Sequence, residues 1–168
     1  MTRSSKQTGH AEGSAGFSRC GHYRYWLRRR WDRTLPQCAV IGLNPSTADA
    51  RIDDPTLRRC IGFATRWGYG SLLLVNLFAW RATDPRELAE ATEPVGAQTN
   101  QWLRRASEES ALVLAAWGNG GLLHNRGREV ASRQACLHCL GTTSLGMPRH
   151  PLYCRADITP RPFIIPPN

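Results

Sequence analysis

Four short apolar runs, separated by stretches with helical patterns, restrict the fold of this chain more than any other feature. The runs span residues 38–43, 71–78, 111–117 and 136–140. The second and third are apolar throughout, which is typical of strands that are covered on both faces in a parallel sheet. Because strands alternate with helices along the chain, we expect an α/β fold: a three-layer α/β/α sandwich with a central, mostly parallel four-stranded sheet.

Helix signals lie between these runs. Asp54 and Pro55 are a typical N-cap and first helical residue, and apolar residues then recur on one face until Gly68. Further helices are expected at residues 97–109 and at about 121–133. Each of them would connect two strands and cover a face of the sheet.

The segment before the first apolar run, residues 20–32, has the sequence CGHYRYWLRRRWD. Tyrosines and a leucine alternate in it with arginines and a tryptophan, which predicts an N-terminal flanking strand or hairpin. Its arginines either meet phosphate groups or form a solvated basic edge that resists aggregation.

Length and composition indicate one domain. A chain of 168 residues can bury one core but is short for two. We expect a disordered polar segment at residues 1–18, a single α/β domain at 19–158, and a Pro-rich extended tail at 159–168 that is packed by Phe163 and Ile164. The sequence has no run of about 18 apolar residues and no apolar leader, so we expect a cytoplasmic monomer without a membrane partner.

The net charge of the chain indicates which kind of partner it binds. A net charge of +9, from 22 Lys and Arg against 13 Asp and Glu, favours polyanions. We expect nucleic acid or a nucleotide; the alternative is that the charge serves solubility alone. The candidate contacts to a nucleic-acid backbone are Arg24, Arg58, Arg81 and Arg149. A local salt bridge with Asp84 is a competing role for Arg81.

Six cysteines raise the question of a metal site. Cys136, Cys139, His150 and Cys154 have residue types and spacings that zinc can use. Against this, two residues three apart in a strand face opposite sides, and free cysteines are often buried. We therefore expect buried thiols, no metal and no cofactor, with structural zinc as the alternative.

Polar residues follow the predicted strands at the points where the strands end. Ligands of an open parallel sheet bind beyond the carboxyl ends of its strands. Any one such residue is explained by a turn or by hydrogen bonds to the backbone, but their shared edge favours a binding site. The residues at this edge are Asn44, Pro45, Ser46, Asn76, Asn119 and His150.

Short motifs in this chain resemble those of a known family, number 1643 in the domain-of-unknown-function series. The motifs are CGHYRYWL, GLNPSTAD, DDPT, NLFAWRATDP, AWGN and HPLY, which lie between residue 20 and about residue 155. A remoter resemblance rests on the order GLNPS, LLVN, AWGN and HPL, which is similar to that of the uracil-DNA glycosylase superfamily. That resemblance implies a four-stranded parallel sheet in an α/β/α sandwich, with active-site motifs at the strand ends.

The superfamily resemblance also implies roles for individual residues. Asn44 resembles the Asn that positions the attacking water, and Asn76 resembles the side chain that reads the Watson–Crick edge of a flipped base. His150 resembles the His that stabilises the leaving base anion, and Leu152 lies near the position of the apolar wedge. The implied function is recognition of a nucleobase in DNA, with hydrolysis of its N-glycosidic bond.

An asparagine is not a strong general base, so hydrolysis needs a carboxylate near Asn44. Among the nearby acids we take Asp49 as the catalytic candidate and Asp54 as a helix cap, although Asp49 also suits a turn. Trp117 either stacks on a base or fills the core. The alternatives to a glycosylase are a non-catalytic, basic nucleic-acid-binding module and a hydrolase that acts on a small nucleoside or nucleotide.

Overall fold

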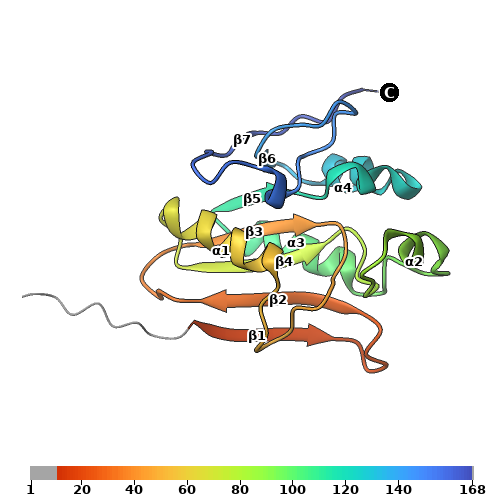
Figure 1. The fold of residues 1–168 in the computed structure, drawn as a ribbon, viewed down its shortest axis with the longest axis horizontal. Helices are drawn as coiled ribbons and strands as arrows, with labels where there is room; N and C mark the ends of the chain where they lie inside the picture. Colours follow the sequence, from red (N-terminus) through yellow and green to blue (C-terminus); the bar gives the residue numbers. More distant parts are fainter. Residues whose placement is uncertain (1–10, 168) are drawn as a thin grey trace, which may run out of the picture.

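The computed structural model describes residues 11–167 of the chain, in which strands and helices alternate (Figure 1). The two elements labelled η are 3₁₀-helices. In chain order the elements are β1 (Glu12–Phe17), β2 (Arg24–Arg30), β3 (Gln37–Gly42), α1 (Pro55–Arg66), β4 (Ser71–Asn76), α2 (Pro85–Glu90), α3 (Thr99–Glu109), β5 (Leu112–Ala115), η1 (Gly118–Asn125), α4 (Arg126–Arg133), β6 (His138–Cys139), η2 (Pro151–Tyr153) and β7 (Arg161–Pro162).

The described residues form one seven-stranded sheet in the order β1-β2-β4-β3-β5-β6-β7. β4, β3, β5 and β6 run parallel to one another. Antiparallel pairs join β1 to β2, β2 to β4, and β6 to β7. The mixed α/β class is therefore confirmed. The sheet has seven strands rather than four because segments near both ends of the chain pair with its edges.

β1 lies within residues 1–18, the segment that we expected to be disordered; residues 1–10 lie outside the described part of the chain. The strand pairs with β2 from Glu12, opposite Arg30, to Phe17, opposite Arg24. Most of its side chains are exposed, so backbone hydrogen bonds, which need no apolar side chains, make the pairing. The expectation of disorder is wrong for this strand, whereas the flanking strand predicted from residues 20–32 is present as β2.

The Pro-rich tail is only partly as expected. Arg161 and Pro162 pair with β6 as β7, so the tail contributes an edge strand. Phe163 is buried in the core, but Ile164 is 84% exposed and does not pack the tail as predicted. Among residues 11–167, no helix is long and apolar enough to cross a lipid bilayer.

Apolar side chains pack on both faces of the sheet. On one face, Leu57 of α1 packs in a cluster with Val40 of β3. On the other face, Leu103 of α3 and Val130 of α4 pack in a cluster with Ile41 of β3. Val40 and Ile41 point to opposite faces because side chains alternate along a strand. In Figure 1, α1 crosses in front of the sheet and α3 lies behind it.

The helix that follows β3 begins where the sequence predicts. The Asp54 carboxylate accepts a hydrogen bond from the Leu57 N–H at 2.8 Å, and Pro55 is the first helical residue. Gly68 follows the helix with a φ of 91°, a conformation that favours glycine. The predicted helix at 97–109 is present as α3, but the one at 121–133 is replaced up to Asn125 by η1, whose residues Leu123 and His124 have non-helical dihedral angles.

The strand order creates a switch point at β3. β3 pairs with β4 on one side and with β5 on the other. The connection through α1 covers one face of the sheet, whereas the connection through α2 and α3 leads back to the other side of β3. Connections that depart in opposite directions leave a crevice beyond the carboxyl end of the strand between them, which is the usual place for a ligand.

Candidate functional site

A cavity of about 210 Å³ lies at this switch point. Its wall is formed by β3 and the residues that follow it, the end of β4, the segment before α2 and the residues that follow β5. The starts of β2, α1 and η2 complete it. A cavity of this size is smaller than the roughly 300–1,000 Å³ of a typical drug-sized site and suits a single small ring. The polar residues that line it are Arg24, Asn44, Ser46, Asp54, Thr56, Asn76, Thr83 and His150.

Hydrogen bonds from the amide nitrogen fix the orientation of the Asn44 side chain. Nδ2 donates to the carbonyl of Ala82 at 2.8 Å and to the carbonyl of Pro45 at 3.1 Å. Among residues 11–167, no donor is hydrogen-bonded to Oδ1. With its nitrogen occupied, the amide presents only an acceptor, which is the group that orients a water molecule or another donor.

Asn76 places an amide at the end of β4. The side chain is 4% exposed, and its Nδ2 has no hydrogen-bond partner among the described residues. Gly42 lies opposite it in the parallel register, and a Cβ at that position would come within 2.8 Å of the Asn76 Oδ1. A buried amide without its hydrogen bonds is costly, so this group is suited to a ligand that supplies them.

His150 is oriented by the turn that follows it. Its Nδ1 accepts a hydrogen bond from the Leu152 N–H at 3.2 Å. The proton of the neutral ring is therefore on Nε2, which leaves that N–H as the donor available to a ligand. Burial lowers the pKa of His150, and the Asp54 charge opposes this shift in part. The ring is thus neutral at pH 7, a hydrogen-bond donor rather than a cation.

Trp117 is both a core residue and part of the cavity wall. It is 1% exposed and makes an edge-to-face contact with Phe163, with ring centroids 5.9 Å apart. Gly121 and Gly127 lie against its indole ring, and a Cβ at either position would come within 3 Å of it. The predicted core role is therefore present, while stacking on a base stays a prediction.

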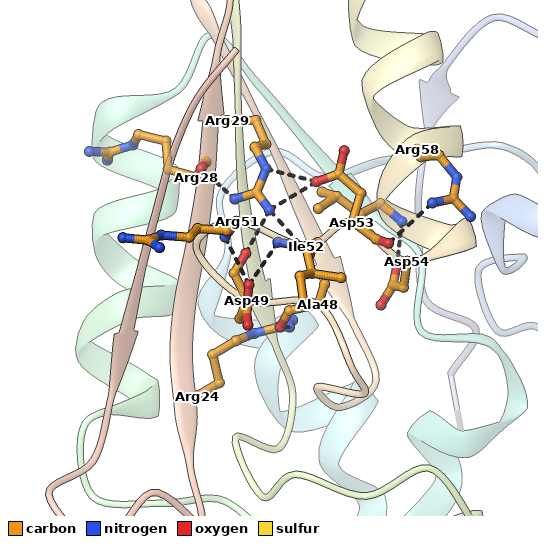
Figure 2. A network of polar contacts seen from close by, with 11 residues as sticks. Arg24, Arg28, Arg29, Ala48, Asp49, Arg51, Ile52, Asp53, Asp54 and Arg58 are labelled. Carbon is orange, nitrogen blue, oxygen red and sulfur yellow. Dashed lines mark hydrogen bonds and ion pairs between the residues drawn. The ribbon is translucent and has the colours of Figure 1, made fainter. Parts of the chain in front are cut away.

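Two buried arginines of β2 hold the loop between β3 and α1 (Figure 2). Arg24 donates from Nη1 to the Ala48 carbonyl at 2.6 Å. Arg29 donates from Nε to the Asp53 carboxylate at 2.9 Å and from Nη2 to the Asp49 carbonyl at 2.6 Å. Arg24 is 2% exposed and lines the cavity, so the structure places it in the pocket rather than on the surface where we expected it to meet a nucleic-acid backbone.

The catalytic candidate Asp49 lies outside the cavity. Its Oδ1 accepts the N–H groups of Arg51 at 2.8 Å and Ile52 at 2.7 Å, which makes it a turn former. These backbone hydrogen bonds lower the pKa of Asp49. Asp54, which we took as a helix cap, does line the cavity while it caps α1. The position of Asp54 at the cavity can be predicted from the sequence, because the helix after a strand begins at the edge of the sheet where that strand ends.

Several other predicted site residues lie apart from the cavity. Pro45 is buried beside it, and Asn119 accepts a hydrogen bond from the Thr143 hydroxyl at 2.6 Å instead of facing the pocket. Leu152 follows His150 and is 45% exposed, as a wedge requires. Thr56, in the first turn of α1, and Thr83, just before α2, also line the cavity, and neither was predicted because a single threonine carries no distinctive sequence signal.

The predicted backbone-contacting arginines other than Arg24 are at the surface. Arg58 donates to the Asp53 carbonyl at 3.1 Å, and Arg149 is exposed. Arg81 donates to the Gly21 carbonyl at 3.1 Å. Its alternative salt bridge with Asp84 is not formed; that carboxylate pairs with Arg86 at 2.8 Å.

The cysteines remain separate thiols. All six are free, with Cys136 exposed and both Cys139 and Cys154 buried. Among residues 11–167, no group of three or more His, Cys, Asp or Glu side chains is placed to hold a metal ion. Burial raises the pKa of Cys38 to about 12, so this thiol stays protonated.

Comparison with known proteins identifies a family. The model of a family described as "Protein of unknown function (DUF1643)" matches residues 24–152, which is more than half of the chain. Searches of curated proteins and of solved structures found no match.

Proposed function

The chain belongs to the DUF1643 family of proteins of unknown function, and we propose that it recognises a nucleobase in DNA and hydrolyses the N-glycosidic bond of that base. One observation carries this proposal. Beyond the carboxyl end of β3, a cavity of about 210 Å³ brings together the acceptor of Asn44, the amide of Asn76 and the N–H of a neutral His150. A held base, an oriented water and a donor for developing negative charge are what the cleavage requires.

The proposal extends to the fold. The parallel strands β4, β3, β5 and β6, with helices packed on both faces, support a fold like that of the uracil-DNA glycosylase superfamily. In this interpretation β1, β2 and β7 are additions to the edges of that sheet. The four motifs that suggested the superfamily lie at the end of β3 (GLNPS), at the end of β4 (LLVN), directly after β5 (AWGN) and at the start of η2 (HPL). Each contributes a side chain to the cavity wall.

Each polar residue of the cavity would have its own role in the hydrolysis. The bond between C1′ and the base nitrogen breaks, and its electron pair leaves with the base. Asn44 holds the water whose oxygen bonds to C1′, and Asp54, the one carboxylate among the described residues that lines the cavity, accepts the released proton. Asn76 hydrogen-bonds the edge of the extruded base, and the His150 N–H donates to its developing anion.

Contacts to DNA would come from the surface around the cavity. The net charge of +9 favours a polyanion, and Arg58, Arg81 and Arg149 are the surface arginines that we assign to phosphates. Leu152, partly exposed beside His150, is suited to fill the gap that an extruded base leaves in the stack.

The test is base release from single- and double-stranded oligonucleotides that carry uracil, other deaminated bases or modified thymines. We expect release by the wild type and losses of about 100-fold or more in Asn44→Ala and His150→Ala. Asn119→Ala is the matched control, because this asparagine also follows a parallel strand but faces Thr143 rather than the cavity. Release that survives both cavity substitutions contradicts the assignment.

A second candidate function is recognition of nucleic acid without turnover. It is favoured by the hydrogen bond that Asp54 already makes to Leu57, since a helix cap accounts for this carboxylate without any role in chemistry. In that case the wild type would bind DNA and release no base from any substrate. Asn44→Ala and His150→Ala would then alter neither property.

A further inference from the structure

Arg24 is a buried cation at the wall of the cavity. Its side chain is 2% exposed, and its Nε–H has no hydrogen-bond acceptor among the described residues. The Ala48 carbonyl, at 2.6 Å from Nη1, is its hydrogen-bond partner. Burial lowers the pKa of Arg24 to about 10, so the guanidinium still carries its charge at neutral pH.

Comparison with the other buried arginines shows what Arg24 lacks. Arg29 pairs with the Asp53 carboxylate at 2.9 Å, and Arg126 pairs with the Glu129 carboxylate at 3.1 Å. None of the ion pairs among residues 11–167 includes Arg24. An arginine that is buried without a carboxylate partner is unusual, because an unpaired charge away from water is costly.

The Asp54 carboxylate also lines the cavity, but its hydrogen-bond partner is the backbone of α1. It accepts the Leu57 N–H and lies at the N-terminus of α1, where the helix dipole favours a negative charge. It forms no ion pair with Arg24. The cavity therefore contains a negative group that caps α1 and a positive group that donates to the Ala48 carbonyl but has no ion-pair partner among the described residues. The charges of Asp54 and Asp49 offset only part of the effect of burial on the pKa of Arg24.

We infer that Arg24 stabilises a negative charge on the group bound in this cavity, and that this group is the leaving nucleobase. The inference rests on the proposed function. When the bond from C1′ to the base nitrogen breaks, both electrons stay on the base, and the water oxygen forms the new bond to C1′. The base then departs as an anion opposite Arg24 and takes its proton from solvent. A fixed charge in a water-poor site stabilises such an anion more strongly than a neutral donor does.

Binding of base-sized anions tests this without turnover. The probes are 5-nitrouracil and urate, each titrated calorimetrically above and below the pH at which it ionises. We expect the wild type to bind at least one of them about 10- to 100-fold more tightly as the anion, and Arg24→Gln to lose that preference while its affinity for the neutral form stays within about threefold. Arg24→Lys should keep part of the preference, because the charge remains without the planar fork.

The matched control is Arg29→Gln. Arg29 is an equally buried arginine of the same strand and holds the same loop, but it does not line the cavity. This variant should keep the preference for the anion. Equal affinity of the wild type for both forms, binding of neither probe, or a preference that survives Arg24→Gln in folded protein would overturn the inference.

Base release separates this inference from the proposed function. For a series of bases with increasing acidity, Arg24→Gln should make the release rate depend more steeply on leaving-group acidity than the wild type does. If the wild type releases base and the two slopes are equal, the role of Arg24 is wrong and the glycosylase function stands. If no base is released but the anion preference disappears in Arg24→Gln, the function is wrong and the anion site stands.

Discussion

The Asp54 carboxylate caps the first turn of α1 and also lines the cavity. Its Oδ1 accepts the Leu57 N–H at 2.8 Å, and the residue lines the same space as Asn44 and His150. A cap can be provided equally well by asparagine, whereas proton transfer needs the carboxylate. The structural and the chemical contributions of this residue are therefore separable by substitution.

We predict that Asp54→Asn keeps the stability of the wild type within a few tenths of a kcal/mol and lowers base release by about 100-fold or more. Asp54→Ala should show the same loss of release together with a loss of about 1 kcal/mol of stability. Urea unfolding and the oligonucleotide assay measure the two effects. Wild-type release by Asp54→Asn would mean that the carboxylate only caps the helix.

His150 should make stability depend on pH. Burial keeps its pKa in the folded chain below its value in the unfolded chain, so the unfolded state takes up a proton that the folded state does not. The stability that depends on neutral His150 is complete above about pH 6.5, the usual histidine pKa, and is lost as the pH falls from there through the lowered pKa. Denaturant unfolding at several pH values between 5 and 8 should show a shallower acid decline for His150→Gln than for the wild type. Identical profiles would contradict this.

At the scale of elements, the positions of η1 and α4 depend on glycines beside Trp117. A Cβ at Gly127 would lie 2.8 Å from the Trp117 Nε1, and one at Gly121 would lie 2.2 Å from its Cδ1. Trp117 cannot withdraw from them, because it is fully buried between these glycines and Phe163. Close packing of the elements after β5 thus positions one wall of the cavity.

We predict that Gly127→Ala destabilises the chain by about 1–3 kcal/mol, the usual cost of overpacking a core. Gly62→Ala is the control: this glycine lies in α1 with nothing within 4 Å of an added Cβ, so the change should stabilise the chain by about 0.5–1 kcal/mol. Urea unfolding of both variants measures these differences. A neutral Gly127→Ala would show that Trp117 can move.

At the scale of the whole molecule, the excess of positive charge should appear in the salt dependence of binding. Arg58, Arg81 and Arg149 are the surface arginines assigned to phosphates. Each phosphate contact lowers the logarithm of affinity by about 0.9 for a tenfold rise in salt on double-stranded DNA. A non-specific attraction of the net charge would not distinguish these three arginines from others.

We predict that replacing Arg58, Arg81 and Arg149 together with alanine makes the salt slope shallower by about 2 to 3. The control removes three arginines with exposed side chains that we assign no contact, Arg33, Arg104 and Arg133, and so changes the net charge equally. Fluorescence anisotropy of a labelled duplex at several salt concentrations gives both slopes. Equal slopes for the two triple variants would mean that net charge alone causes the salt dependence of binding and that the three assigned arginines do not contact phosphates.

Much of the fold is predictable from local patterns. The cap at Asp54, the helix α3 and the parallel strands β3, β4 and β5 follow from caps, apolar runs and periodicity, which depend on residues close in the sequence. The edge strands β1 and β7 were not predicted. Their own residues show no strand pattern, and they form strands because their backbones pair with β2 and β6.

Local patterns in the sequence establish the chemistry available at one edge of the sheet: two asparagines and a histidine at or beyond the ends of strands. Long-range packing selects the acid that joins them, Asp54 rather than Asp49, and buries Arg24 beside them. The difference arises because caps and strand ends are short-range properties. The neighbours of a cavity are set by long-range strand pairing, here the antiparallel contact of β2 with β4 that carries Arg24 to the carboxyl end of β3.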